Sequence, residues 1–278
     1  MVDPFKGPRL KLARAYDHLV DLERTERQFF EQNPTRIDFD LSSEPGHKLA
    51  RIILDAAPPE IMHVIAGELI YQLRSSLDQL AVAMARMSIA KPNPKKVKYP
   101  CGDRLSDFKA KCKRDLAGFD RDFVKEIIRT RPYDGANDTL RAVFRMANID
   151  KHMELIAMGT TGGFAGLADF KISGAFAAFR LDGPGDLQRG VVFSDLFPEG
   201  TIEPTHPEAK INFTAEITVG DVGVYEGKGL IPFLRSMLEE TRRVYERFEA
   251  LCVATGRADK AADAPIYWRF NAPSSLTG

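Results

Sequence analysis

Two short stretches place charged and amide side chains inside segments that otherwise have the apolar periodicity of helices. Residues 71–79 read YQLRSSLDQ, and residues 148–152 read NIDKH. On a helical wheel, Arg74 and Asp78 lie in a row beside the apolar stripe of the first segment, and Lys151 falls within the stripe of the second. Because burying an ion without a partner is costly, these side chains need partners from elsewhere in the fold. We therefore expect the two segments to face each other across one polar pocket.

The residue types in this pocket could act on an anion or simply bind one. His152 could move a proton, while Arg74 and Lys151 could stabilise a phosphorane, and together this is the chemistry of metal-independent RNA cleavage. These three are the candidate catalytic residues. The candidate binding residues are Tyr71, Asp78, Arg145, Asn148 and Asp150. The same side chains could instead clamp a small anion or nucleotide without chemistry, or form a structural network such as an Arg74–Asp78 ion pair. The sequence leaves open whether the protein is an enzyme.

The order of several motifs resembles a large family of uncharacterised bacterial proteins. The motifs are AYDHLVDLE, ELIYQLRSSLDQLA, KYP, IIRTRPYDG and MANIDKHMELI, which lie between about Leu10 and Met158. The family pattern is (HN)LRSxLDx followed by NxDKH. The long helix is also similar to the signature of HEPN (higher-eukaryote and prokaryote nucleotide-binding) ribonucleases, an arginine followed after four to six residues by a histidine. The resemblance implies a HEPN-like helical bundle and nucleic-acid binding or RNA cleavage.

The chain departs from the family pattern at positions that matter for catalysis. Tyr71 and Gln72 stand where the family has histidine and asparagine, Gln79 replaces the following histidine, and Met153 replaces an arginine. Because glutamine cannot carry a proton, a HEPN-type reaction on this helix would lack its acid or base. These departures suit the alternative function, a non-catalytic module that binds an anion, a nucleotide or another protein.

Helices and strands of recognisable pattern must position these residues. Apolar spacing predicts long helices at 8–32, 58–89 and 230–253, short helices at about 106–113 and 121–131, and a helix that carries NIDKH from an N-cap at Asn137 or Asp138 to about Met158. The stretches TRIDFDL and HKLARIILDA predict a hairpin, and alternation within 159–228, including VGVYEG at 222–227, predicts further antiparallel strands. The sequence thus predicts an α+β fold in which a helical layer packs with an antiparallel β-sheet.

The predicted organisation is a single domain with four parts. These are a mainly helical part at 1–158 that includes the hairpin, a strand-rich part at 159–228, a C-terminal helix at 229–256 and a tail at 257–278. The tail contains the only tryptophan, Trp268, and could pack on another subunit, so a homodimer is one expectation.

Composition and charge indicate the class of protein. With 278 residues, 44% of them hydrophobic, the chain is long enough for a sizeable core. Because no apolar run has the length of a signal peptide or membrane span, we expect a cytoplasmic protein without membrane contacts.

Cys101, Cys112 and Cys252 lack metal-binding spacing, and no metal or cofactor is predicted. Zero net charge argues against wholesale nucleic-acid binding, although the basic segment from Lys91 to Arg114 could contact RNA phosphates or be a solvated surface.

Overall fold

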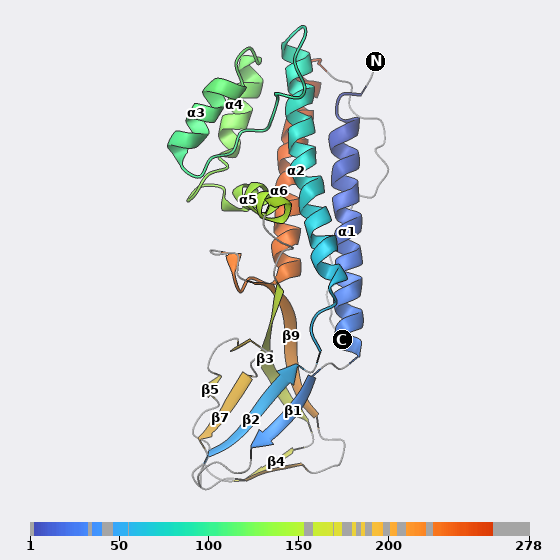
Figure 1. Ribbon diagram of the computed structural model, residues 1–278, viewed down its shortest axis with the longest axis vertical. Helices are drawn as coiled ribbons and strands as arrows, with labels where there is room; N and C mark the ends of the chain where they lie inside the picture. The colour runs from blue at the N-terminus through green and yellow to red at the C-terminus, as the bar shows by residue number, and fades with distance from the viewer. Residues whose placement is uncertain are drawn as a thin grey trace. The chain divides into compact units, whose positions relative to one another are not determined.

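The computed structural model describes residues 3–32, 35–40, 47–54, 56–152, 158–168, 170–173, 180–181, 185–186, 191–196, 201–204, 210–220 and 225–257. The helices in these ranges are α1 (Lys6–Glu31), α2 (Ile61–Ser88), α3 (Leu105–Asp115), α4 (Arg121–Thr130), α5 (Asp138–His152) and α6 (Leu230–Ala254) (Figure 1). The strands are β1 (Thr35–Asp40), β2 (His47–Leu54), β3 (Met158–Ala168), β4 (Phe170–Ser173), β5 (Arg180–Leu181), β6 (Gly185–Asp186), β7 (Val191–Leu196), β8 (Thr201–Pro204) and β9 (Lys210–Val219). All the helices predicted from apolar spacing are present.

The chain divides into two compact units. Unit 1 comprises Met1–Asp21, Ile65–Leu155 and Leu234–Gly278, and unit 2 comprises Leu22–Val64 and Ile156–Phe233. The predicted hairpin therefore belongs to the same unit as the strand-rich segment that follows α5. The single α+β domain, with a helical layer packed on a sheet, stays a prediction.

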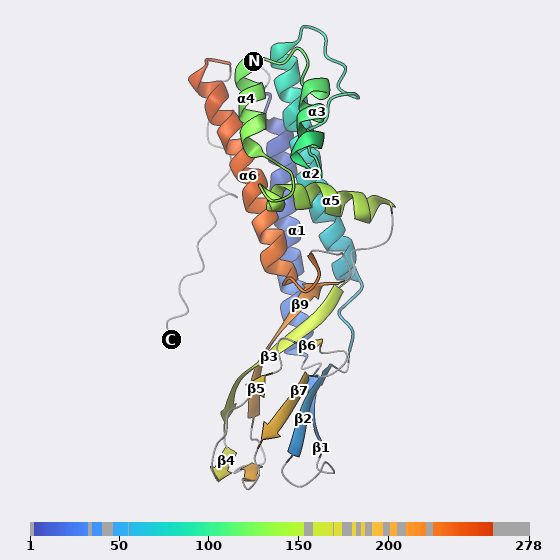
Figure 2. The same cartoon turned by 90° about the vertical axis from the view of Figure 1, so that its left-hand side faces the viewer.

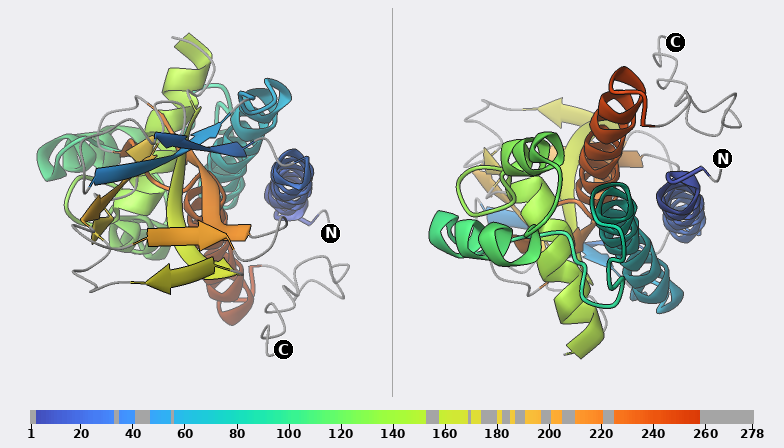
Figure 3. Two further views of the ribbon diagram at one scale, coloured as in Figure 1. Left: turned by 90° about the horizontal axis from the view of Figure 1, so that it is seen from below. Right: turned by 90° about the horizontal axis from the view of Figure 1, so that it is seen from above.

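The core of unit 1 is built by one face of each long helix. Leu12 and Leu19 of α1, Leu73 and Leu77 of α2 and Leu234 of α6 are almost completely buried, and seven- and four-residue spacings place such side chains on one helical face. Burying each leucine contributes about 1.5–3 kcal/mol. Within unit 1, α1 and α2 run antiparallel and α6 lies beside them (Figures 2 and 3). The long helices, held together by these apolar faces, therefore support the shorter helices.

Helix α5 runs across the long helices and is fixed at two points (Figure 2). At its start, Asn137, one of the two residues predicted as the N-cap, accepts a hydrogen bond at Oδ1 from the Leu140 N–H at 3.0 Å. The Asn137 amide also donates to Glu240 Oε1 of α6 at 2.8 Å. In its middle, the buried ring of Phe144 lies 4.1 Å from the guanidinium carbon of Arg74 on α2. The two helices that carry the quoted motifs therefore do meet in unit 1.

Helix α4 is attached to the end of α2 and to the segment between α2 and α3. The Asp120 N–H, just before α4, donates to Ser88 Oγ at 3.0 Å. The buried Tyr99 hydroxyl donates to Thr130 Oγ1 at the end of α4, also at 3.0 Å. The first bond is partly buried and the second is buried, and together they fix α4 beside the end of α2.

Unit 2 contains antiparallel strand pairs. The predicted hairpin is confirmed, since β1 pairs with β2 in a register that sets Thr35 opposite Leu54. Strand β2 also pairs with β7, and β7 with β5. A second set has the order β6-β3-β9, and β4 pairs with β8. These pairings agree with the alternating sequence of the segments that form them.

Two boundary predictions are wrong. The helix that carries NIDKH was expected to reach Met158, but α5 ends at His152, and Met158 begins β3 opposite Val219 of β9. The alternation at 222–227 was expected to form a strand; residues 222–224 lie outside the described part of the chain, but Tyr225–Gly227 form a turn in which the Gly227 N–H donates to the Val219 carbonyl at 2.9 Å. In both places pairing with a distant segment or turn closure outweighs the local pattern.

Candidate functional site

Arg74 and Asp78 form a partly buried pair that also holds the segment before α3. The Arg74 Nε donates to Asp78 Oδ2 at 3.1 Å, and the other carboxylate oxygen accepts from the Tyr99 N–H at 2.9 Å. The side chains of Arg74 and Asp78 are 22% and 31% exposed. The ion pair anticipated as a structural alternative is therefore present, and a third partner from the KYP motif completes it. Both oxygens of Asp78 already have partners within the fold.

The remaining predicted residues of α2 and α5 occupy different environments. Tyr71 is exposed on α2, with the Lys11 ammonium 5.8 Å from its ring centre. On α5, Arg145 is half-buried and Asn148 is exposed. Asp150, Lys151 and His152 belong to the last turn of α5, and their side chains lie outside the described part of the structure. Their predicted roles in catalysis and binding therefore stay predictions.

A buried arginine one turn before Arg145 has an unusual set of contacts. The side chain of Arg141 is only 8% exposed, and its two terminal nitrogens lie 3.0 Å from Asp134 Oδ1 and 3.4 Å from Asp103 Oδ1. Both carboxylates are mostly exposed, at 70% and 78%. The third nitrogen, Nε, is buried and has no hydrogen-bond partner within the part of the chain that the structure describes. A buried donor without a partner is uncommon in folded proteins and is a feature of ligand sites.

The two carboxylates come from loops that are tied to each other. The Asp134 N–H donates to the Asp103 carbonyl at 3.2 Å, and the Gly102 N–H donates to the Pro132 carbonyl at 3.1 Å. Gly102 has no room for a side chain, because a Cβ there would collide with the backbone nitrogen of Phe108. These contacts bring both acids over Arg141 from the solvent side, even though neither belongs to a helix.

An open pocket of about 420 Å³ lies beside this arginine. It is lined by Asp103, Arg141, Arg145, Asn148 and Ile149. We call it the α5 pocket. Two guanidinium groups, an amide and one carboxylate face a volume of the size that accommodates small ligands. Arg74 and Asp78 are not among its lining residues, so the pocket lies between α5 and the loop at 102–104 and not directly between the two motif helices.

Sequence reasoning missed three residues of this arrangement. Arg141 was not among the residues chosen from the sequence, although its position one turn from Arg145 was the available signal. Asp103 and Asp134 gave no signal of their own, since each is one acid in a loop rich in turn residues. Only the fold brings them to the guanidinium.

The thiol of Cys101 is made unreactive by burial. Burial raises the pKa of the Cys101 thiol to about 11, although the cations of Arg74 and Lys111 act in the opposite direction. The thiol is therefore protonated near neutral pH and is a poor nucleophile.

Within the described ranges, no group of three histidine, cysteine, aspartate or glutamate side chains is arranged to hold a metal ion. In the same ranges, no helix has an apolar stretch long enough to cross a bilayer.

Comparison of the chain with models of known families, with curated proteins and with solved structures gave no match. The site is therefore interpreted from its own geometry.

Proposed function

We propose that the protein is a binding protein for a small anion, held in the α5 pocket without being chemically changed. The observation that carries the proposal is the buried Arg141 guanidinium, whose Nε–H has no partner in the described part of the chain while the neighbouring pocket is also lined by Arg145. A carboxylate or phosphate oxygen is the natural acceptor for such a donor, because charge-assisted hydrogen bonds to guanidinium are short and strong.

The contacts of Arg74 and Asp78 give both residues a positioning role. The Arg74 Nε donates to Asp78, and the guanidinium stacks on the Phe144 ring of α5. The other Asp78 oxygen accepts from the Tyr99 N–H. These two residues therefore hold α5 and the segment around Tyr99.

The chemical class of the ligand follows from the charges that line the pocket. Two guanidinium groups and the carboxylate of Asp103 line the pocket, while Asp134 holds Arg141 at 3.0 Å and the bond from Arg141 to Asp103 is longer, at 3.4 Å. An acidic ligand, such as a dicarboxylate or a phosphate ester, could therefore displace Asp103 from Arg141. The Asn148 amide can donate or accept, and would distinguish ligands that carry a hydroxyl group beside the acid.

Calorimetric and thermal titrations test this proposal. Wild-type protein is titrated with phosphate, succinate, citrate and adenosine monophosphate, together with the variants Arg145→Ala and Arg141→Lys. A ligand at about 100 times its Kd should stabilise the protein by about 2.7 kcal/mol and raise the Tm by several degrees. Arg145→Ala should abolish this shift, and Arg141→Lys, which keeps the charge but loses the planar donors, should reduce it.

The control variant is Arg86→Ala, which removes an exposed arginine near the end of α2. It lowers the net charge by the same amount as Arg145→Ala but leaves the α5 pocket intact, so its titrations should match the wild type. Equal shifts in wild type and Arg145→Ala would contradict the proposal, as would the absence of any shift with the whole panel.

A second candidate, RNA binding or cleavage, is supported by the exposed lysines in the loop before α3. Lys91, Lys95, Lys96 and Lys98 are all exposed there, where they could contact phosphates. This candidate uses His152 as the proton carrier, with Lys151 beside it. Incubating a mixed RNA pool with wild type and His152→Ala in the presence of chelator tests it. Histidine-dependent products with cyclic phosphate ends would favour the HEPN-like function over simple binding.

We further propose that the protein is a cytoplasmic homodimer that resembles the bacterial family. In this proposal its helical layer packs on an antiparallel sheet. The free thiols of Cys101, Cys112 and Cys252 suit a reducing compartment.

A further inference from the structure

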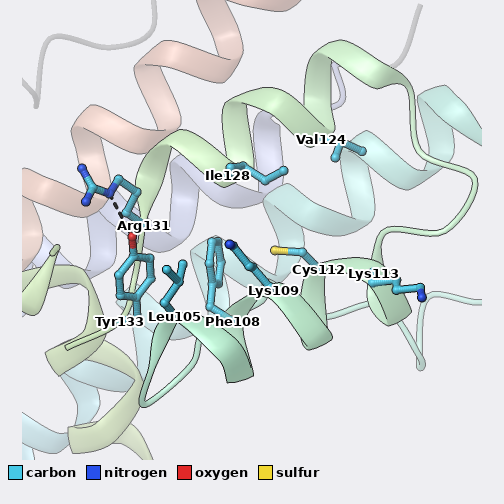
Figure 4. A pocket seen from close by; sticks show the side chains of 9 residues that line it. All are labelled: Leu105, Phe108, Lys109, Cys112, Lys113, Val124, Ile128, Arg131 and Tyr133. Atoms are coloured by element: carbon cyan, nitrogen blue, oxygen red, sulfur yellow. Dashed lines mark hydrogen bonds between the residues drawn. The ribbon is translucent and has the colours of Figure 1, made fainter. Parts of the chain in front are cut away.

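A second pocket, of about 410 Å³, lies between α3 and α4 (Figure 4). Its walls are mainly apolar, with Leu105 and Phe108 from α3, Val124 and Ile128 from α4, and Tyr133 from the segment after α4. We call it the α3–α4 pocket. Its uncharged polar groups are the Cys112 thiol and the Tyr133 hydroxyl. Its volume is in the range of small-molecule sites, which are lined mostly by apolar and aromatic side chains.

The apolar groups at the mouth of this pocket are left in contact with water. Leu105 is 44% exposed and Ile128 is 48% exposed, and the Phe108 ring between them forms a buried floor at 2%. Covering exposed aliphatic side chains with an apolar ligand removes them from water, which favours binding. The pocket therefore suits a ligand with a compact hydrocarbon body.

Three cationic side chains line the pocket, those of Lys109, Lys113 and Arg131. Figure 4 shows the Lys109 side chain reaching past the Phe108 ring toward Ile128, whereas Lys113 points away at the far end of α3. Arg131 lies at the other end, where its Nε donates to the Tyr133 hydroxyl at 3.1 Å. Among the residues that the structure describes, no carboxylate forms an ion pair with Lys109 or Arg131. Both charges are thus available to an acidic group.

The backbone at Arg131 provides an independent observation. Arg131 ends α4 with a φ of 49°, the only positive φ of a residue other than glycine in the described ranges. A left-handed conformation is costly for a residue with a Cβ, and glycine is the usual residue at such a position. An arginine here places a guanidinium beside the pocket that glycine could not supply.

We propose that the α3–α4 pocket binds an apolar carboxylate, an aryl or medium-chain alkyl acid. The hydrocarbon body lies between Leu105 and Ile128 over Phe108, and the carboxylate accepts a hydrogen bond from Lys109. A nucleotide suits the pocket less well, because the uncharged polar groups of its walls are the Cys112 thiol and the Tyr133 hydroxyl, and this hydroxyl already accepts a hydrogen bond from Arg131. The inference does not depend on the α5 pocket, since the two sites share no lining residue.

Isothermal titration of the full chain with 2-naphthoate and octanoate tests the inference and distinguishes aryl from alkyl ligands. Two matched probes separate the contributions. The neutral 2-naphthalenemethanol has the apolar body without the charge, and acetate has the charge without the apolar body. At least one of the two apolar acids should bind, and each matched probe should bind about tenfold more weakly or not at all, because each lacks one of the two contributions.

Matched variants locate the binding. Lys109→Met should weaken binding about tenfold through loss of a charge-assisted hydrogen bond, and Ile128→Glu should abolish it by placing a negative charge at the mouth. Lys95→Met removes the same charge from an exposed side chain that lines neither pocket, and should leave affinity unchanged. Circular dichroism of each variant confirms that it has folded.

Three results would overturn the inference. The first is an absence of binding by both apolar acids, and the second is equal affinity for the acid and its neutral analogue. The third is binding that is lost in Arg145→Ala but kept in Lys109→Met, which would place the acid in the α5 pocket and would support that proposal instead.

Discussion

Removing the carboxylate of Asp78 should destabilise unit 1 considerably, even though the side chain is partly exposed. In Asp78→Ala the Tyr99 N–H loses its acceptor at 2.9 Å, and the Arg74 Nε loses its acceptor at 3.1 Å. Tyr99 is 2% exposed, so little water can reach its amide to replace the lost bond. Arg74 keeps its contact with the Phe144 ring, which limits the damage on that side.

The size of the effect follows from these two losses. A hydrogen bond to a charged group is worth about 1.5–3 kcal/mol. The Arg74–Asp78 pair is discounted for its exposure to solvent and contributes at most about 1 kcal/mol. The expected loss is therefore about 1.5–4 kcal/mol. Asp78→Asn, which keeps an oxygen for the Tyr99 N–H but loses the charge, should cost about half as much.

Urea denaturation followed by the helical circular dichroism signal measures this difference. With an m-value of about 1–3 kcal/mol per molar urea, the midpoint of Asp78→Ala should fall by about 1 M. The control is Asp122→Ala on α4, an exposed acid that lies 3.7 Å from Lys125, which should change stability by no more than about 0.5 kcal/mol. If Asp78→Ala were as stable as Asp122→Ala, the positioning role assigned to Asp78 and Arg74 would be refuted.

Three further predictions concern single side chains. Asp103→Asn removes the carboxylate that competes for Arg141, so the affinity for phosphate or succinate, measured by calorimetry, should rise severalfold; a fall would mean that Asp103 helps to bind the ligand. Burial lowers the pKa of His18 below its ordinary value of 6.5, so the unfolded chain binds the extra proton as the pH falls. Stability measured by urea denaturation should therefore decrease below about pH 6.5, and His18→Gln should remove this part of the decrease. Burial also raises the pKa of Cys101 to about 11, so only about a thousandth of this thiol is ionised at pH 8. Alkylation of Cys101 by iodoacetamide, followed by peptide mass spectrometry, should be far slower in the folded protein than in urea, and comparable rates would contradict this prediction.

The helices were predictable because each carries its own signals. The apolar stripe of α2 begins after Pro58 and Pro59 and continues without a break, and α5 has an N-cap at Asn137. The end of α5 was not predictable in the same way. Apolar residues continue the helical pattern from His152 to Met158, but Met158 pairs with Val219, about sixty residues away along the chain. Strand pairing of this kind depends on a partner that local periodicity cannot reveal.

The candidate site was predictable only where both partners share a helix. The Arg74–Asp78 pair follows from their four-residue spacing, and the structure contains it. Their third partner, the Tyr99 N–H, comes from a loop and could not be inferred from periodicity. The same applies to Arg141, whose acidic partners are supplied by two loops that only the fold brings together.

The most direct test of the central claim is calorimetric titration of wild type and Arg145→Ala with phosphate and succinate, with Arg86→Ala as the control. We expect at least one of these anions to bind to wild type and Arg86→Ala with equal affinity and to show no measurable binding to Arg145→Ala. Binding that is the same in all three proteins would place the anion elsewhere on the surface and contradict the assignment of the α5 pocket.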